Sequence, residues 1–192
     1  MSTLVLASGS AYRAELLAKL QLDFISFNSE VDESPQPGEN PAQLAIRLAQ
    51  AKARAVGVMF PHGLIIGSDQ VALCGTQLLG KPGQRQPAIA QLQAQSGQCV
   101  EFYTAVSVFD ASRNRCLTDL DITRVYFRQL SLEQIEHYVD LEQPYACAGS
   151  FKAEGLGIAL FSGIESSDPS ALIGLPLIKL VSLLARFGVT VL

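Results

Sequence analysis

A turn near the start of the chain combines residue types that bind anions. Ser8-Gly9-Ser10 follows an apolar run, and Arg13 comes three residues later, where a segment with helical spacing begins. The first turn of a helix carries unpaired N–H groups and the positive end of the helix dipole, which together favour a phosphate. Ser8, Ser10 and Arg13 are therefore candidate phosphate ligands. A serine N-cap beside a solvated arginine explains the same residues equally well.

Lys52 and Asp69 are charged residues at positions where the surrounding pattern is apolar. In a helix from Pro41 to about Val56, Lys52 falls on the apolar arc, where an ammonium group must reach solvent or meet an anion. Asp69 lies in the middle of an apolar strand from Leu64 to Leu73, and a polar group there needs a partner. Its carboxylate could be a general base or a ligand for a hard cation such as Mg²⁺. Capping or turn formation explains such an aspartate about as often.

Glu33 and Lys81 extend this set of charged groups. Glu33 belongs to an acidic cluster with Glu30 and Asp32 just before a proline-rich loop, and Lys81 lies in the turn Gly80-Lys81-Pro82. Cationic side chains can hold phosphates while a metal ion and a carboxylate generate an attacking hydroxide. This part of the chain thus carries the groups needed for a metal-assisted attack on a polyphosphate.

Several other functions are disfavoured. The sequence has no G-x-x-x-x-G-K-[ST] loop and no G-x-S-x-G elbow, and His62 and His137 are expected at the surface rather than in catalysis. A net charge of −4 without a basic stripe argues against nucleic-acid binding. The apolar segment from Ala171 to Leu192 contains a proline, a lysine and an arginine, which favours a core helix over a membrane span.

The cysteines and the N-terminus indicate the compartment. Cys74, Cys99, Cys116 and Cys147 show no C-x-x-C spacing, so we expect buried free thiols in a reducing cytosol rather than a disulfide or a zinc site. The N-terminus lacks the basic and long apolar regions of a secretory signal. We therefore expect a cytoplasmic protein.

The candidate residues must be positioned by strands and helices that mix without strict βαβ alternation. We expect one domain spanning residues 1–192 with an α/β fold, in which helices flank a mixed, twisted sheet and two lobes around a cleft are one permitted arrangement. Capping-box patterns at Asn40/Gln43 and Ser131/Gln134 mark two helix starts, and Asp168-Pro169 is expected to cap the last helix. The strands are expected at residues 3–7, 24–31, 64–73, 75–79, 100–109, 117–127, 158–161 and 189–192, and the helices at 11–20, 41–56, 87–95, 131–141 and 169–186.

Motifs spread over nearly the whole chain resemble one enzyme family. The segments, in order, are LASGSAYRAELL, VDE, LAQAKA, IIGSDQV, GKP, AGSFKAEGLGI and DPSALIGLPL. In motif order and spacing they look like the Maf family of nucleoside triphosphate pyrophosphatases, and most like its branch acting on 7-methyl-GTP. The resemblance implies a fold similar to the inosine-triphosphate pyrophosphatases, a divalent metal, with Mg or Mn expected, and release of pyrophosphate from a nucleotide.

The same resemblance implies roles for individual residues. Asp69 matches the proton acceptor of the catalytic group, and Asp69 and Glu33 are the expected metal ligands. Ser8 and Arg13 match the phosphate-binding turn, to which we add the hydroxyl of Ser10. The catalytic group comprises Glu33, Lys52, Asp69 and Lys81, and the positions that set substrate choice are Tyr12, Gln70 and Glu154.

Two departures and two alternatives accompany this reading. Family members usually have proline at position 11 and arginine at position 14, whereas this chain has Ala11 and Ala14, so Arg13 lacks its usual neighbour.

One alternative function is pyrophosphate release from UTP, dTTP or another modified nucleotide. The other is a non-catalytic nucleotide-binding regulator of cell division. We expect a small nucleotide as partner, no nucleic acid or membrane, and a monomer or homodimer.

Overall fold

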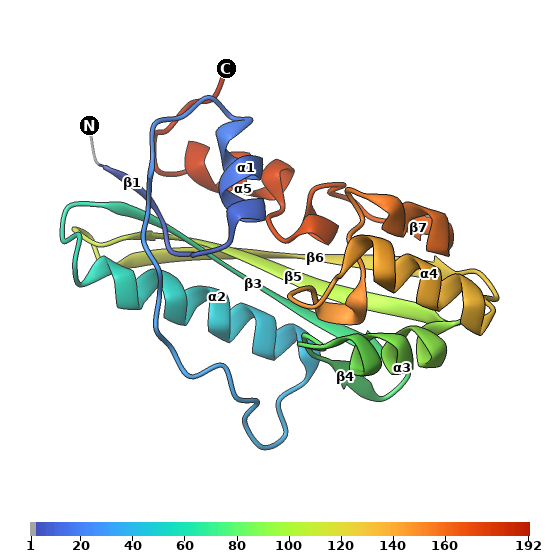
Figure 1. Ribbon diagram of the computed structural model, residues 1–192. Helices are drawn as coiled ribbons and strands as arrows, with labels where there is room; N and C mark the ends of the chain where they lie inside the picture. The colour runs from blue at the N-terminus through green and yellow to red at the C-terminus, as the bar shows by residue number, and fades with distance from the viewer. Residues whose placement is uncertain (1–2) are drawn as a thin grey trace. The chain divides into compact units, whose positions relative to one another are not determined.

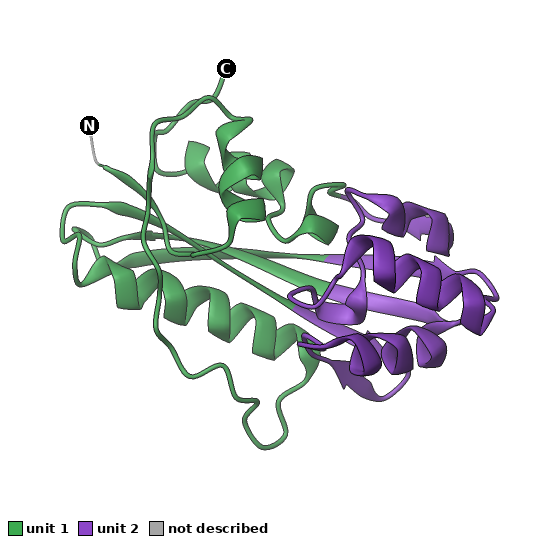
Figure 2. Cartoon of the chain, in the orientation of Figure 1, with its two compact units in different colours: residues 1–70, 103–121, 168–192 green, residues 71–102, 122–167 purple. Residues whose placement is uncertain are grey.

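The computed structural model describes residues 3–192 (Figure 1). The chain forms two compact units (Figure 2). The first unit comprises the described residues up to Gln70 together with 103–121 and 168–192, and the second comprises 71–102 and 122–167. Because strands β3, β5 and β6 each contain residues of both units, the chain passes from one unit to the other within the sheet.

The strands form one mixed sheet, which confirms the predicted α/β class with flanking helices. Hydrogen-bonded neighbours follow the order β2-β1-β3-β5-β6-β7, and β4 pairs with β3. β1 is parallel to both β2 and β3, whereas β3 with β4 and β6 with β7 are antiparallel. The strands are β1 (Leu4–Leu6), β2 (Ile25–Ser26), β3 (Leu64–Cys74), β4 (Gln77–Leu79), β5 (Cys99–Asp110), β6 (Arg115–Phe127) and β7 (Phe161–Glu165).

In the first unit, alternate residues of β1 face different helices. Leu4 and Leu6 belong to a buried cluster that includes side chains of α1 (Ala11–Ala18) and α5 (Leu177–Ala185). Val5 and Ala7 belong to another cluster that includes side chains of α2 (Pro41–Gly57). Because successive side chains of a strand point to opposite faces, α1 and α5 cover one face of the sheet and α2 the other (Figure 1).

In the second unit, aromatic rings and two helices form the packing. α3 (Arg85–Gln95) contacts α4 (Leu132–Glu142) and a short 3₁₀ helix, η1 (Ala148–Ser150). Phe151 lies at the centre of a group of edge-to-face rings, with centroid distances of 5.4, 5.7 and 4.8 Å to Phe102, Phe127 and Phe161. Edge-to-face packing of this kind adds to the burial of apolar area.

Both predicted capping boxes are confirmed. Asn40 Oδ1 accepts from the backbone N of Gln43 at 2.9 Å, and Gln43 Oε1 accepts from the backbone N of Asn40 at 3.0 Å. Ser131 and Gln134 make the same reciprocal pair at the start of α4. These side chains satisfy N–H groups that have no partner within the helix, and so fix where α2 and α4 begin.

Four predictions about the C-terminal part are wrong. Residues 156–160 form a 3₁₀ helix, η2 (Leu156–Leu160), and the strand begins only at Phe161. The last helix is interrupted: η3 (Ala171–Ile173) ends at Gly174, whose φ of 124° favours glycine, and Pro176 precedes α5. The N-cap of α5 is Pro176 and not Asp168, although Asp168 Oδ2 accepts from the backbone N of Ile178 in the first turn of α5 at 2.7 Å. Residues 189–192 do not form a strand.

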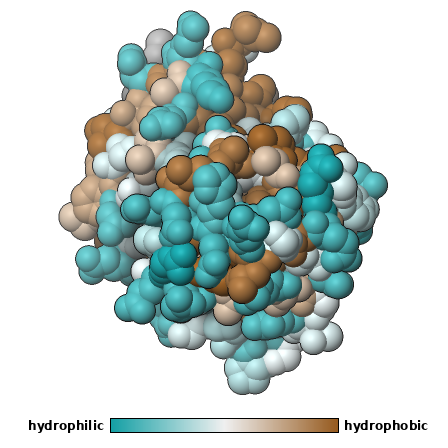
Figure 3. Space-filling model, turned by 45° about the vertical axis from the view of Figure 1, so that its right-hand side comes forward, coloured by the Kyte–Doolittle hydropathy of each residue, from teal (hydrophilic) through white to brown (hydrophobic). Residues whose placement is uncertain are grey.

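The histidines and the cysteines differ in how well their predicted exposure agrees with the structure. His62 and His137 are exposed, as predicted. The four cysteines are partly exposed rather than buried, so that part of the prediction is wrong. In the described residues 3–192 no helix has the length and apolar character needed to cross a membrane. Figure 3 shows a face on which small hydrophobic patches lie among hydrophilic residues.

Candidate active site

Lys52 lies between two carboxylates. Its Nζ is 2.7 Å from Asp69 Oδ1 and 2.5 Å from Glu33 Oε1. The side chains of Lys52 and Asp69 are each 8% exposed, whereas that of Glu33 is 58% exposed. The sequence predicts that a lysine on the apolar arc of α2 reaches solvent or meets an anion, and the structure shows the second outcome. The three residues, from α2, β3 and the loop before α2, form one charged cluster.

The pleat of β3 separates Asp69 from its neighbours. Ser68 Oγ donates to the carbonyl oxygens of Ala105 at 2.8 Å and Gly174 at 2.9 Å. Asp69 points to the other face, toward α2. These polar side chains in the middle of a buried strand therefore all have partners, as burial requires.

Gln70 is held by the protein through its amide nitrogen. Nε2 lies 3.0 Å from Thr104 Oγ1 and 3.0 and 3.1 Å from the carbonyl oxygens of Ala171 and Leu172. These contacts tie β3 to η3. The amide oxygen of Gln70 is consequently the atom we consider for a ligand.

A close approach between β3 and α2 brings Asp69 to Lys52. A Cβ atom added at Gly67 would lie 2.8 Å from the backbone N of Ala53 and 3.0 Å from its Cβ, and it would also overlap the carbonyl of Ala49. Only glycine on the strand, facing alanines on the helix, permits this separation. Lys52 is next to Ala53, and Asp69 is two residues after Gly67, so the contact sets the geometry of the ion pair.

Arg13 is fixed by the segment before α5. Its Nε donates to the carbonyl oxygen of Gly174 at 2.9 Å, the same oxygen that accepts from Ser68. Burial lowers the pKa of Arg13, while the nearby carboxylates of Asp69 and Glu33 raise it, and a guanidinium remains charged throughout the working pH range. Arg13 thus provides positive charge close to both carboxylates.

The turn before α1 is shaped by its two serines. Ser10 is the N-cap of α1, with its Oγ accepting from the backbone N of Arg13 at 3.4 Å, and Ser8 Oγ accepts from the backbone N of Ser10 at 3.1 Å. Ser8 is buried and Ser10 partly exposed. The serine N-cap and the anion site were alternatives in the sequence; the cap is present, and phosphate binding at this turn stays a prediction.

Burial dominates the titration of Asp69. It raises the pKa of this carboxyl group, and the opposing effects of Lys52 and Arg13 offset the increase only in part. A carboxylate with a raised pKa is a stronger base than a solvated one, which suits proton abstraction.

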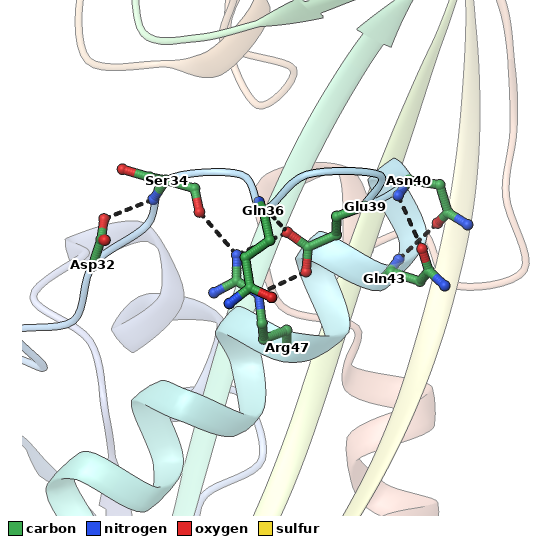
Figure 4. A network of polar contacts seen from close by, with 7 residues as sticks. All are labelled: Asp32, Ser34, Gln36, Glu39, Asn40, Gln43 and Arg47. Carbon is green, nitrogen blue, oxygen red and sulfur yellow. Dashed lines mark hydrogen bonds and ion pairs between the residues drawn. The ribbon is translucent and has the colours of Figure 1, made fainter.

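The loop that contains Glu33 is hydrogen-bonded to α2, as Figure 4 shows for the residues on either side of Glu33. Arg47 of α2 contacts Glu39 and the carbonyl of Ser34, the residue after Glu33. Asp32 Oδ1 accepts from the backbone N of Ser34 at 2.9 Å. Of the three acidic residues in the predicted cluster, Glu33 is the one paired with Lys52, while Asp32 shapes the loop.

Lys81 and Glu154 belong to the second unit. Lys81 is exposed in a turn whose Gly80 carbonyl accepts from Gln91 Nε2 at 3.1 Å. Glu154 is exposed in the turn between η1 and η2, a turn held by Glu142, whose Oε1 accepts from the backbone N of Leu156 at 2.8 Å. Tyr12 lies partly buried in the first turn of α1, in the first unit.

Comparison with known families identifies the chain. The family described as "Maf-like protein" matches residues 3–187. The chain belongs to the Maf family. Relatives of full length support this assignment: proteins of Nitrosococcus oceani (52% identical, 99% of this chain and 96% of the relative), Aliivibrio fischeri (49%, 100% and 99%) and Xanthomonas oryzae (55%, 98% and 98%) are each named 7-methyl-GTP pyrophosphatase.

A solved structure supports the fold of this Maf-family chain. The structure of a HAM1 protein from Coxiella burnetii aligns with a TM-score of 0.50 at 13% identity, covering 97% of this chain and 100% of the other. At that identity the similarity concerns the fold alone. It agrees with the mixed sheet and flanking helices described above.

The carboxylates of this Maf-family chain suit a hard divalent ion held jointly with a ligand. Among the described residues, no group of three or more His, Cys, Asp or Glu side chains is arranged to hold a metal. Asp69 and Glu33 both reach the same ammonium group, so their oxygens lie close together. Mg²⁺ is usually bound by one or two carboxylates together with substrate phosphates. The residues present therefore fit such an ion.

Several residues that shape the site were not identified from the sequence. Ser68, Thr104 and Arg47 contribute through hydrogen bonds to distant segments. In the sequence, Ser68 and Thr104 stand out as polar residues within otherwise apolar strands. For Arg47 no local pattern exists, because Glu39 precedes the helix and the Ser34 contact is made by a backbone carbonyl.

Proposed function

We propose that this chain hydrolyses 7-methyl-GTP to 7-methyl-GMP and pyrophosphate. The observation that carries the proposal is the buried pairing of Lys52 with Asp69, next to Glu33 and Arg13, in a chain similar over its full length to proteins named 7-methyl-GTP pyrophosphatase. This cluster combines a basic carboxylate with fixed positive charge, the combination that water attack on a phosphoric anhydride needs.

In the proposed reaction Asp69 is the general base. Its carboxylate takes a proton from a water molecule as the water oxygen bonds to the α-phosphorus. The bond between the α-phosphorus and the bridging oxygen breaks, and pyrophosphate leaves with that oxygen. Lys52 holds Asp69 by one oxygen at 2.7 Å, which orients the carboxylate, and Lys52 and Arg13 offset the negative charge that develops on the phosphates.

The other candidate residues bind the nucleotide in this proposal. Ser8, Ser10 and the N-terminus of α1 contact the phosphates together with Arg13, and Lys81 supplies a further positive charge. Substrate choice is assigned in this proposal to three residues with different chemistry: the aromatic ring of Tyr12, the amide of Gln70 and the carboxylate of Glu154.

A divalent cation, Mg or Mn, completes the proposal. Asp69 and Glu33 would hold it. When bound, the ion supplies positive charge that offsets the polyphosphate and makes water more acidic. Since one lysine contacts both carboxylates, Lys52 also limits the repulsion between them. We place this activity in the cytoplasm, in a monomer or homodimer.

The test is pyrophosphate release from a panel of nucleotides. With Mg²⁺ or Mn²⁺ present, 7-methyl-GTP should be turned over faster than GTP, UTP or dTTP. Asp69→Asn keeps the shape of the side chain but removes its basicity, so turnover should fall roughly 10²-fold or more. Asp110→Asn, at a buried carboxylate bonded to Ser112 and Arg113, is the matched control and should keep turnover.

Isotope labelling and the panel distinguish the remaining outcomes. In ¹⁸O-labelled water the label should enter 7-methyl-GMP; label in pyrophosphate would mean attack at the β-phosphorus. A preference for UTP, dTTP or another nucleotide would correct the substrate. An absence of turnover on every nucleotide would leave the binding regulator as the better description.

A further inference from the structure

Glu33 needs support from the rest of the protein to stay beside Lys52. It lies between β2 and α2, in residues 27–40, which the structure describes without helix or strand. Its side chain is 58% exposed, so packing contributes little to its position. An ion pair of a long, exposed side chain adds little stability, because holding the side chain in one rotamer costs entropy. Contacts that fix the surrounding backbone therefore help to hold Glu33 in place.

Arg47 makes those contacts. Its Nε and Nη2 donate to the two carboxylate oxygens of Glu39 at 2.6 and 2.9 Å, and Nη2 also donates to the carbonyl oxygen of Ser34 at 3.0 Å (Figure 4). Ser34 directly follows Glu33 in the middle of the loop, and Glu39 lies near the end that leads into α2. One guanidinium group thus joins two points of the loop to α2.

The contacts at Glu39 extend back into the loop. Glu39 Oε2 also accepts from the backbone N of Gln36 at 3.0 Å. The Glu39 side chain is only 8% exposed, although neighbouring residues of the loop are exposed. The hydrogen bond from Arg47 lowers the pKa of Glu39, in keeping with a charge-assisted bidentate pair. Lysine could not reproduce this geometry, because it lacks the planar fork of donors.

Arg47 and Lys52 act on Glu33 from the same helix. They are five residues apart, about 7.5 Å along the helix axis. Lys52 holds the carboxylate of Glu33, and Arg47 holds the backbone carbonyl of the next residue. Two fixed points on one rigid element define where Glu33 lies.

We propose that Arg47 is a positioning residue, which keeps the Glu33 carboxylate at Lys52 and Asp69 by fixing the loop through Ser34 and Glu39. The inference rests on the proposed pyrophosphatase function, in which Glu33 belongs to the catalytic group. Arg47 touches neither substrate nor reacting atoms; it acts through Glu33.

Kinetics of Arg47→Met test this role. Methionine keeps the apolar stem and removes every donor. We expect kcat for 7-methyl-GTP to fall about 10- to 10²-fold, because small displacements of a catalytic group have effects of that size, with KM changed much less. Arg47→Lys should recover only part of the loss. Arg54→Met is the matched control on the same helix, since Arg54 contacts Asn114 and the ring of Phe109, and it should keep wild-type kcat.

A double-mutant cycle separates positioning from a general effect on stability. In a Glu33→Gln background, Arg47→Met should lower kcat less than 2-fold further, because the two changes remove the same contribution. An equal loss from Arg47→Met in both backgrounds would show that Arg47 acts independently of Glu33, and would overturn the proposal.

Amide hydrogen exchange tests the loop without any enzyme assay. The backbone N–H groups of Ser34 and Gln36 should exchange faster in Arg47→Met, while those of α2 stay protected, and Arg54→Met should change neither. If the wild type hydrolyses no nucleotide, the proposed function fails. The exchange measurement then still tests whether Arg47 fixes the loop. Unchanged exchange at Ser34 and Gln36 would overturn the proposal for Arg47.

Discussion

Lys52 and Asp69 form a buried ion pair between α2 and β3, with 2.7 Å between Nζ and Oδ1. Neither side chain is accessible enough for water to replace its partner. The pair is consequently part of the fold as well as part of the proposed catalytic group. This double role determines what substitution of either residue should do.

Lys52→Met should lower both activity and stability. Removing an unpaired lysine from an apolar arc would not lower the free energy of unfolding. Removing Lys52, however, leaves the Asp69 carboxylate buried without its closest cation. We expect a loss of about 3 kcal/mol in the free energy of unfolding, measured by urea denaturation. The double variant Lys52→Met/Asp69→Asn should regain part of that loss. A single variant as stable as wild type would show that Asp69 is neutral in the folded protein.

Gly67→Ala should separate α2 from β3. The added methyl group would lie 2.8 Å from the backbone N of Ala53, so helix and strand must move apart, at a cost of about 1–3 kcal/mol. Pyrophosphate release should fall as well, because the Lys52–Asp69 distance increases. The control is Gly163→Ala, where the new atom would lie 3.8 Å from Tyr126 Cδ2, an ordinary contact. Wild-type stability in Gly67→Ala would contradict the close approach.

The Glu39–Arg47 pair should make part of the stability sensitive to acid. The bond to Arg47 holds the pKa of Glu39 below its ordinary value of 4.5. Between the two values the unfolded chain binds more protons, so this contribution is complete above the ordinary pKa and is lost as the pH falls through the lowered one. Denaturation curves of wild type and Glu39→Gln should therefore differ at neutral pH and converge in acid. A constant difference at every pH would argue against the pair.

Tyr12 and Glu154 should contribute to the choice of base. N7-methylation gives guanine a positive charge, which favours an aromatic face and a carboxylate, and stacking of a cation on tyrosine contributes about 0.5–2 kcal/mol. Tyr12→Ala and Glu154→Ala should each raise KM for 7-methyl-GTP more than for GTP, whereas Tyr12→Phe should retain the preference. An equal loss on both nucleotides would mean that these residues support the fold or the phosphates.

Much of this protein was determined by local sequence. The capping boxes at Asn40/Gln43 and Ser131/Gln134 fixed two helix starts, because their hydrogen bonds join residues three apart. The mixed sheet followed from apolar strands without βαβ alternation. Lys52 was identified because it is a charged residue on the apolar arc of α2, and a helical projection of the sequence shows this directly.

Other features were decided only by the tertiary structure. The last helix was predicted as continuous from Asp168-Pro169, but Gly174 and Pro176 divide it, and the carbonyl of Gly174 thereby becomes the acceptor for Arg13 and Ser68. Arg47 gave no local signal, since its partners are a carboxylate eight residues earlier and a backbone carbonyl in a loop. Periodicity reports which face of an element is buried; it does not report which groups from distant segments meet there, because those contacts arise only when the sheet and its helices pack.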